Sequence, residues 1–312
     1  MERGFQQAGL PYCALEQLDN YVPSHSYYAF LLNMAQTEGI EDLGFRVGHQ
    51  FGADCADPNM VRLLQQSTTL YSALLNASEV INRTVTHCRV GLFRPKNGDY
   101  SYFYHRPSCK TDNPAIAQIG WFGVTTLIGT VQVFTGPHWK PTEIGVMTNR
   151  VPSRFIREQF PNTRIRQTQH YSYIALENAL LSLPPRNAEE TTPASAIDRT
   201  EPFSNDFIGS VEQVLYSYVR ENNLDIELVA NICNMSKRTL QRKLADKGTS
   251  YSRLLDRVHF KYASRMLKGS DINVTDIAHQ LGYNDISHFC RAFRRITGVT
   301  PSEYRVQHNS RT

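Results

Sequence analysis

One sequence pattern occurs twice in the last third of this 312-residue chain, and it constrains the fold more than any other feature. The first copy covers residues 228–244 and the second covers residues 276–293. In each copy an alanine, Ala230 or Ala278, lies in the first predicted helix, where its small side chain lets a partner helix approach closely. A short turn and a second predicted helix follow. The duplication therefore predicts two helix-turn-helix units of the same design.

The start of the second helix in each unit is marked by a residue that can cap it. Ser236 in the first unit corresponds to Asp285 in the second, after a one-residue insertion in the turn. Both side chains can accept hydrogen bonds from the free amides of a helix N-terminus. Apolar residues four and eight positions after the cap are expected to hold this helix against the core: Leu240, Leu244, Phe289 and Phe293. In helix-turn-helix proteins this second helix enters the major groove of DNA.

The segment between the two units predicts one long amphipathic helix, from Ser250 to Lys268. Two recognition helices joined by such a helix can lie about one DNA turn, roughly 34 Å, apart on one face. A single chain would then read two successive major grooves.

Charge is distributed unevenly along the chain, and this bears on the partner. The whole chain has 33 basic and 29 acidic residues, for a net charge of +4. Residues 1–200 contain 17 of each kind, whereas residues 231–312 contain 15 basic and 6 acidic residues, a net charge of +9. A basic segment with groove-sized helices indicates an anionic partner, and double-stranded DNA is the first choice.

A proline-containing stretch divides the chain. Residues 183–202 have little apolar sequence and no helical or strand period, so they predict a linker. The predicted organisation is a domain of residues 1–182, this linker, and a domain of residues 203–312. The predicted fold class is multi-domain: a mixed α/β N-terminal domain, and an all-α C-terminal domain with two helix-turn-helix motifs joined by a long helix.

The N-terminal domain is predicted to mix helices and strands. Helical spacing of apolar residues predicts helices over residues 27–34, 60–64, 70–81, 114–134 and 172–181. Two-residue alternation predicts a hairpin of strands 85–92 and 100–104, and weaker strands over 143–148 and 164–167. In the C-terminal domain helical spacing predicts seven helices, of which the last begins at Pro301.

The same sequence argues against several classes of protein. No run of about 18 apolar residues occurs, because Gly123 and Gly129 interrupt the most apolar stretch, so no membrane span is expected. The first residues lack the basic and apolar regions of a signal peptide. No signature of a serine hydrolase, phosphate-binding loop, zinc protease or zinc deaminase is found. Neither enzyme activity nor a cofactor is therefore expected.

The cysteines and histidines predict no metal site. Six cysteines are scattered singly, which indicates reduced thiols in the cytoplasm: Cys13, Cys55, Cys88, Cys109, Cys233 and Cys290. His87 and Cys88 would point to opposite faces of a strand, so they are not expected to bind one ion.

Longer stretches of the sequence resemble a known family. The last hundred residues resemble the DNA-binding domain of AraC/XylS-type regulators, in Ile277–Tyr283, His288–Phe293 and Gly298–Arg305. The N-terminal domain resembles the sensor domain of one AraC subgroup, called arabinose-binding-like by name only. The stretches that carry this second resemblance are Glu41–His49, Leu70–Leu75 and the exit at Pro184-Pro185.

The resemblance implies an effector-responsive transcription regulator, usually an activator, that binds promoter DNA and recruits RNA polymerase. It implies a cytoplasmic, nucleoid-associated protein and leaves a homodimer open. A small-molecule effector is implied, but neither its identity nor its binding residues follow.

Three exposed positions of each recognition helix are predicted to meet the bases, namely the second, fifth and sixth after the cap. They are Arg238, Gln241 and Arg242 in the first helix, and Ser287, Cys290 and Arg291 in the second. Arginine can bind guanine and glutamine can bind adenine through two hydrogen bonds, whereas serine and cysteine cannot make such bidentate contacts. We therefore expect the first helix to supply more base specificity. Phosphate contacts are predicted for Lys237, Lys243, His288, Arg294 and Arg295.

Other interpretations stay open at this stage. The helical module can serve protein interaction, or the chain can be a constitutive nucleoid-type binder without an effector. A DNA-repair or DNA-modifying enzyme can carry the same module, but the spacing of the N-terminal cysteines shows no cluster that would activate one of them. Two features could bind an effector or be ordinary surface: the stripe Tyr100, Tyr102 and Tyr104, and the arginines Arg150, Arg154 and Arg157.

Overall fold

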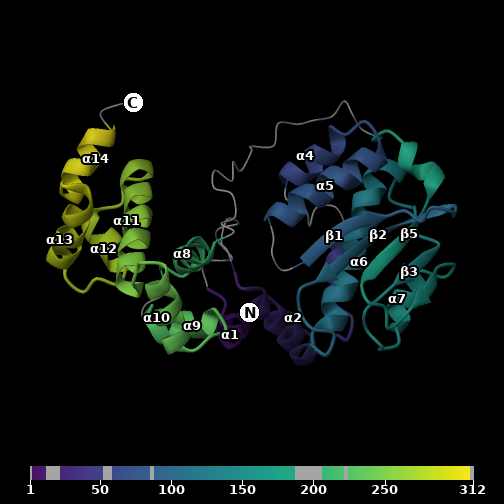
Figure 1. Ribbon diagram of the computed structural model, residues 1–312, viewed down its shortest axis with the longest axis horizontal. Coiled ribbons are helices and arrows are strands. Elements are labelled where there is room, and N and C mark those ends of the chain that lie inside the picture. Colours follow the sequence, from purple (N-terminus) through teal and green to yellow (C-terminus); the bar gives the residue numbers. More distant parts are fainter. Residues whose placement is uncertain are drawn as a thin grey trace. The chain divides into compact units, whose positions relative to one another are not determined.

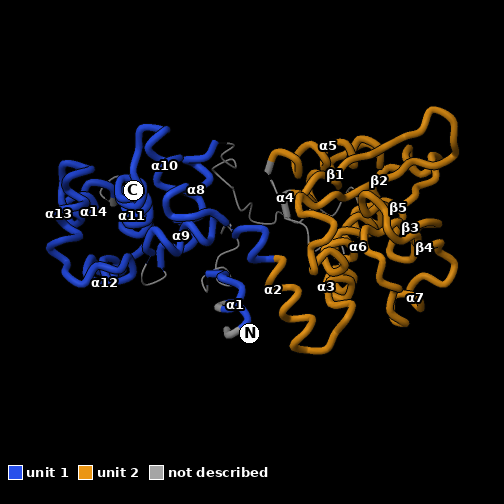
Figure 2. The backbone as a smooth tube through the Cα atoms, turned by 60° about the horizontal axis from the view of Figure 1, so that its bottom comes forward, with its two compact units in different colours: residues 1–27, 204–312 blue, residues 28–203 orange. Residues whose placement is uncertain are grey.

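The structure, a computed structural model (Figure 1), describes residues 2–11, 22–51, 58–84, 88–186, 206–220 and 224–309. The chain divides into two compact units (Figure 2), one of Met1–Tyr27 with Ser204–Thr312 and the other of Tyr28–Phe203. The first residues therefore group with the C-terminal helices, whereas the sequence alone places them in a domain of residues 1–182. Most of the segment 183–202 lies outside the described residues, so the linker stays a prediction.

The second of these units, called here the α/β unit, is built around one five-stranded sheet (Figure 1). The sheet order is β1-β2-β5-β3-β4, and neighbouring strands are antiparallel except for the parallel pair β3–β4. The strands are β1 (Cys88–Phe93), β2 (Tyr100–Pro107), β3 (Glu143–Gly145), β4 (Arg164–Arg166) and β5 (Ser172–Glu177). The helices are α2 (Ser24–Thr37), α3 (Leu43–Phe51), α4 (Pro58–Gln65), α5 (Leu70–Thr84), α6 (Ile116–Thr135) and α7 (Arg154–Gln159). The mixed α/β class predicted for this part of the chain is confirmed.

Helix α6 forms the centre of the core. Its buried residues, among them Val124 and Val131, pack in one cluster with Ile144 of β3 and Ile174 of β5. Among the described residues α6 is the one helix that is long and apolar enough to cross a membrane, with a mean hydropathy of 1.3 over its 18-residue window. However, 72% of that window is buried inside the structure. Its hydropathy therefore reflects its place in the core.

The hairpin predicted from two-residue alternation is confirmed. β1 pairs with β2 in antiparallel register from Cys88↔Pro107 to Phe93↔Tyr102. The predicted start of the first strand, with His87, falls on residues 85–87, which lie outside the described residues. The weaker strand predictions are confirmed in shorter form as β3 and β4.

The helix predicted over residues 172–181 is wrong in its first half. Ser172–Glu177 forms β5, which lies between β2 and β3 in the sheet, and only Asn178–Ser182 (η3) is helical, as a 3-10 turn. Residues 172–176 are all buried, so both faces of this strand are covered. A strand buried on both faces has a continuous apolar run, and this pattern cannot be distinguished from a short helix by its spacing.

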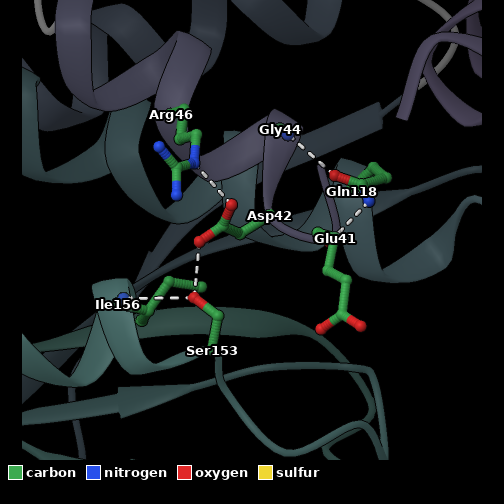
Figure 3. A network of polar contacts seen from close by, with 7 residues as sticks. All are labelled: Glu41, Asp42, Gly44, Arg46, Gln118, Ser153 and Ile156. Atoms are coloured by element: carbon green, nitrogen blue, oxygen red, sulfur yellow. Dashed lines mark hydrogen bonds and ion pairs between the residues drawn. The ribbon is translucent and has the colours of Figure 1, made fainter. Parts of the chain in front are cut away.

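The stretch Glu41–His49, which carries part of the family resemblance, joins α3 to α6 (Figure 3). The Gly44 amide donates to Gln118 Oε1 over 2.7 Å, and Gln118 Nε2 donates to the Glu41 carbonyl over 2.8 Å. A Cβ atom at Gly44 or at Gly48 would overlap atoms of α6. Glycine at these two positions therefore lets α3 lie directly against α6.

Asp42 ties the same stretch to α7 (Figure 3). Its buried carboxylate accepts hydrogen bonds from Arg46 Nε over 2.6 Å and from the Ser153 hydroxyl over 2.5 Å. Ser153 in turn caps α7 by accepting from the Ile156 amide over 3.3 Å. Because a buried carboxylate needs such partners, this network is part of the scaffold. These residues of the stretch therefore have a structural role.

The other unit, called here the helical unit, is all α-helix in its described part. Its helices are α1 (Glu2–Ala8), α8 (Phe207–Ser217), α9 (Ile226–Ile232), α10 (Lys237–Asp246), α11 (Tyr251–Gly269), α12 (Val274–Gln280), α13 (Ile286–Thr297) and α14 (Pro301–Asn309). The seven helices predicted for residues 203–312 are thus confirmed. The Tyr218 hydroxyl donates to the Gly9 carbonyl over 2.6 Å, which joins the segment after α1 to these helices.

Candidate nucleic-acid interface

The two helix-turn-helix units, α9–α10 and α12–α13, have the same hydrogen bond across their turns. In the first unit the Met235 amide donates to the Ala230 carbonyl over 2.9 Å. In the second unit the Tyr283 amide donates to the Ala278 carbonyl over 3.0 Å. The donor and the acceptor are five residues apart in both units, so the repeat seen in the sequence is also a repeat of the backbone.

The residue before each donor has a left-handed backbone conformation. Asn234 has a φ of 52° and Gly282 has a φ of 76°. Glycine adopts this conformation without steric cost, and asparagine tolerates it better than most residues. The predicted caps are confirmed two residues after Asn234 and three residues after Gly282: Ser236 and Asp285 each accept a hydrogen bond from an amide of the helix that follows.

The second helix of each unit is fixed to one shared core. The predicted apolar positions are buried in it: Leu240, Leu244, Phe289 and Phe293. Helix α11 contributes Leu254, Val258 and Leu267 to the same cluster. In Figure 1 α11 runs beside α12, α13 and α14. The long joining helix is therefore part of the support of the second unit.

Helix α10 presents three long polar side chains to solvent. Arg238, Gln241 and Arg242 are all exposed. None of the three has a hydrogen bond or an ion pair with another residue in the described part of the chain. They lie away from the buried face of α10, as predicted. Their donors are therefore available to a partner outside the chain.

Helix α13 presents a chemically poorer surface at the matching positions. Ser287 and Arg291 are exposed, whereas Cys290 is half-buried and packs against the core. Burial raises the pKa of the Cys290 thiol, which keeps it neutral. Arg291 is the one predicted base-contacting residue on this helix that is exposed and has a long hydrogen-bonding side chain.

Two of the predicted phosphate contacts on α10 have partners within the helical unit. Lys237 Nζ lies 2.9 Å from Glu227 Oε1 of α9, in an exposed ion pair. The Lys243 ammonium lies over the Phe207 ring, 5.1 Å from its centroid. Exposed pairs of this kind contribute about 1 kcal/mol or less, so both side chains can exchange partners at low cost.

The predicted phosphate contacts on α13 differ among themselves. His288 Nε2 lies 3.8 Å from the Asp285 carboxylate, and Arg294 is exposed. Arg295 Nη2 donates to the Asp256 carboxylate of α11 over 2.5 Å. Arg295 therefore joins α13 to α11, a role that was not anticipated from the sequence.

Two residues from the family-like stretches also turn out to hold the unit together. The Arg305 guanidinium of α14 donates to the Ile272 carbonyl in the loop after α11. The Tyr283 hydroxyl lies 3.2 Å from His259 Nδ1 of α11. From sequence alone an arginine in a basic module suggests DNA contact. The contacts of Arg305 with Ile272 and of Tyr283 with His259 join residues that are far apart in the sequence, so they follow only from the folded structure.

Two described cysteines of the α/β unit, Cys88 and Cys109, lack the environment of a nucleophile. Burial raises the pKa of Cys88 to about 11 and also raises the pKa of Cys109. A reactive cysteine needs a lowered pKa, so these two thiols do not support an alkyl-transfer enzyme. Cys13 and Cys55 lie outside the described residues. In the described part of the chain no group of three His, Cys, Asp or Glu residues has the arrangement of a metal site.

Comparison with known families agrees with the geometry of both units. Residues 229–307 match the family described as a helix-turn-helix domain. Residues 1–185 match the family described as the arabinose-binding domain of AraC transcription regulator, N-term. This second match covers more than half of the chain. The chain therefore belongs to the AraC family of transcription regulators.

Individual relatives match mainly in the helical unit. The ornithine utilization regulator of Pseudomonas aeruginosa is 42% identical over 81 residues, which are 26% of this chain and 24% of that protein. The HTH-type transcriptional regulator AdiY of Escherichia coli is 31% identical over 103 residues, 33% of this chain and 40% of AdiY. The chain thus matches a quarter to two-fifths of the length of these relatives. The predicted class, a DNA-binding transcription regulator, is confirmed by the family.

A solved structure matches over most of the chain. The transcriptional regulator CdpR from Pseudomonas aeruginosa covers 97% of this chain and 96% of its own, with 20% identity and a TM-score of 0.42.

Proposed function

We propose that this chain is an effector-responsive activator that inserts α10 and α13 into two successive major grooves of promoter DNA. The observation that carries the proposal is the repeated turn. The two turns share one hydrogen bond and one left-handed residue, and the second helix of each unit packs into the same core. Two helices presented alike from one core suit two grooves on one face of DNA.

We assign different roles in DNA recognition to α10 and α13, because their exposed side chains differ. Arg238, Gln241 and Arg242 of α10 have the donors and acceptors that read guanine and adenine in the major groove. On α13 the corresponding base contacts are Ser287, Cys290 and Arg291. We assign phosphate contacts to Lys237, Lys243, His288, Arg294 and Arg295, since cations that border a recognition helix fix its register on the backbone. The first helix therefore supplies most of the base specificity.

The response to an effector is assigned to residues 1–182, with residues 183–202 as a linker to the DNA-binding domain of residues 203–312. A small molecule that binds one conformation of this part more tightly than another shifts the population toward it. The bound state then favours contact with DNA or formation of a homodimer. The DNA-bound protein recruits RNA polymerase, and its place in the cell is the nucleoid within the cytoplasm.

A gel-shift experiment tests the proposal. The full chain is titrated against the intergenic DNA beside its own gene and against a scrambled duplex, at physiological salt, because salt controls the nonspecific part of binding. We expect at least a thousandfold preference for the specific duplex. Arg242→Ala should weaken specific binding about 5- to 150-fold, as expected for loss of one bidentate base contact of 1–3 kcal/mol.

The matched control is Arg83→Ala, which removes an exposed arginine of α5 that pairs with Glu79. This variant should bind DNA like the wild type. Circular dichroism of both variants checks that they are folded. A folded wild-type protein that shows no preference among duplexes would contradict the proposal.

A further inference from the structure

A cavity of about 730 Å³ opens at the end of the sheet in the α/β unit, where β2 ends and β5 begins. Six of its lining residues matter for its chemistry: Arg89, Arg106, Lys110, Met147, His170 and Tyr171. None of the described residues that line it is acidic. Its volume is within the range of small-molecule sites, about 300–1,000 Å³.

Two arginines face each other at this cavity. Arg89 of β1 is the direct cross-strand partner of Arg106 of β2. Like charges directly opposite each other destabilise a sheet. Arg89 Nη1 donates to the Asn82 carbonyl over 2.9 Å, but neither guanidinium forms an ion pair with a described residue. Elsewhere on the same sheet Arg166 lies 2.7 Å from the Glu143 carboxylate. Within the described residues, the arginine pair therefore lacks a counter-charge like the one that Glu143 supplies to Arg166.

The remaining wall of the cavity suits a carbon skeleton. Met147 and Pro107 are buried apolar residues. The Tyr171 ring packs against Tyr104 with centroids 5.3 Å apart, which fixes its orientation beside the cavity. Burial raises the pKa of the Cys109 thiol, so this residue adds no negative charge. The cavity thus combines positive charge with an apolar wall.

A strained turn positions part of this wall. Thr168 has a φ of 57°, which is rare for a β-branched residue and costs on the order of 1–3 kcal/mol. The turn is held by the Thr168 amide, which donates to the Thr148 carbonyl over 3.0 Å, and by the Gln169 amide, which donates to the Val146 carbonyl over 3.0 Å. His170 and Tyr171, which follow this turn directly, both line the cavity. Strain kept at a cavity is typical of a binding site.

We propose that this cavity binds a small organic anion with at least two carboxylate or phosphate charges. Guanidinium groups match the oxygen geometry of both anions, and an anion placed between Arg89 and Arg106 removes their repulsion. A neutral sugar would leave this repulsion uncompensated. The role of this anion as the effector rests on the proposed function. Its binding to the cavity does not rest on it, because binding is measured without DNA.

Isothermal titration calorimetry of the full chain tests the site with three probes: citrate, glycerol 3-phosphate and the neutral sugar arabinose. We expect at least one of the two anions to bind tenfold or more tightly than arabinose, and the tighter one identifies the carboxylate or the phosphate as the preferred group. Arg106→Gln should weaken that anion at least tenfold. Arg164→Gln removes an exposed arginine of β4 that does not line the cavity, and it should change the affinity less than twofold.

Binding of neither anion, or equally tight binding of arabinose, overturns the proposal. Equal weakening by Arg106→Gln and Arg164→Gln also overturns it, since the effect would then be one of general charge. If Arg106→Gln does not fold, Arg89→Gln takes its place with the same expectations. A gel shift without the anion separates the two proposals: loss of sequence preference by the wild type contradicts the proposed function and leaves the anion site standing.

Discussion

The two helix-turn-helix units have the same turn but different outer surfaces. Helix α10 exposes Arg238 and Arg242 without partners among the described residues, whereas α13 half-buries Cys290 and pairs Arg295 with Asp256. The core positions, the caps and the left-handed residue recur in both units. Support and readout are therefore set by different residues of the same helix.

The largest expected effect is on the shared support. Phe289→Ala should lower the free energy of unfolding by about 3–5 kcal/mol, and Leu240→Ala by about 2–5 kcal/mol, because both side chains are completely buried. Urea denaturation of the purified variants measures both. Ser287→Ala, an exposed control on the same helix as Phe289, should stay within about 0.5 kcal/mol of the wild type. A small cost for either core variant would show that one unit does not depend on the common core.

The next effect separates the two readout surfaces. Arg242→Ala should cost about 1–3 kcal/mol of specific binding, since a bidentate contact to guanine is lost. Arg291→Ala should cost less, and Cys290→Ser should change the affinity less than twofold. Fluorescence anisotropy on one specific duplex compares all three. A larger loss for Arg291→Ala than for Arg242→Ala reverses the assignment of the helices.

A third prediction concerns the turns. Gly282→Val should destabilise the chain by about 1–2 kcal/mol, because φ is 76° there and a β-branched side chain is strained in that conformation. No atom of the described residues lies within 4 Å of a Cβ added at this position, so the cost is conformational. At the matching position of the first unit, Asn234→Gly should be neutral or slightly stabilising. Gly269→Ala, in an ordinary helical conformation with open space around it, is the control and should not destabilise the chain.

The smallest expected effect is a pH dependence located at the second unit. Burial lowers the pKa of His259 to about 4, below the 6.5 of the unfolded chain. The unfolded chain therefore binds the proton more tightly, and stability is fully present above pH 6.5 and is lost as the pH falls toward 4. Urea denaturation at pH 7 and pH 5 should show a loss on the order of 1 kcal/mol. In His259→Gln this loss should be smaller. If the stability of the wild type and of His259→Gln depends on pH in the same way, the assignment of this effect to His259 is contradicted.

How much of the molecule could be predicted differs between the two units. In the helical unit the signals are local: Ser236 and Asp285 mark helix starts, and apolar residues at fixed spacing mark the buried face. In the α/β unit the sequence pattern does not reveal β5, because a strand covered on both faces lacks alternation. The sequence does not predict the cavity either, because its lining residues come together only through the pairing of the strands. Arg89 and Arg106 are cross-strand partners because of the register of β1 and β2, and this register cannot be read from the sequence of either strand alone.

The central claim is that α10 and α13 read two successive grooves, and that α10 reads its groove more strictly. The most direct test measures the affinity of the full chain for a set of duplexes, each with one base pair of the binding site changed. We predict two clusters of sensitive positions with centres about 10–10.5 base pairs apart. Single changes should cost about 1–3 kcal/mol in the more sensitive cluster, and Arg242→Ala should flatten that cluster alone. A single cluster, or an unchanged pattern in Arg242→Ala, would contradict the account.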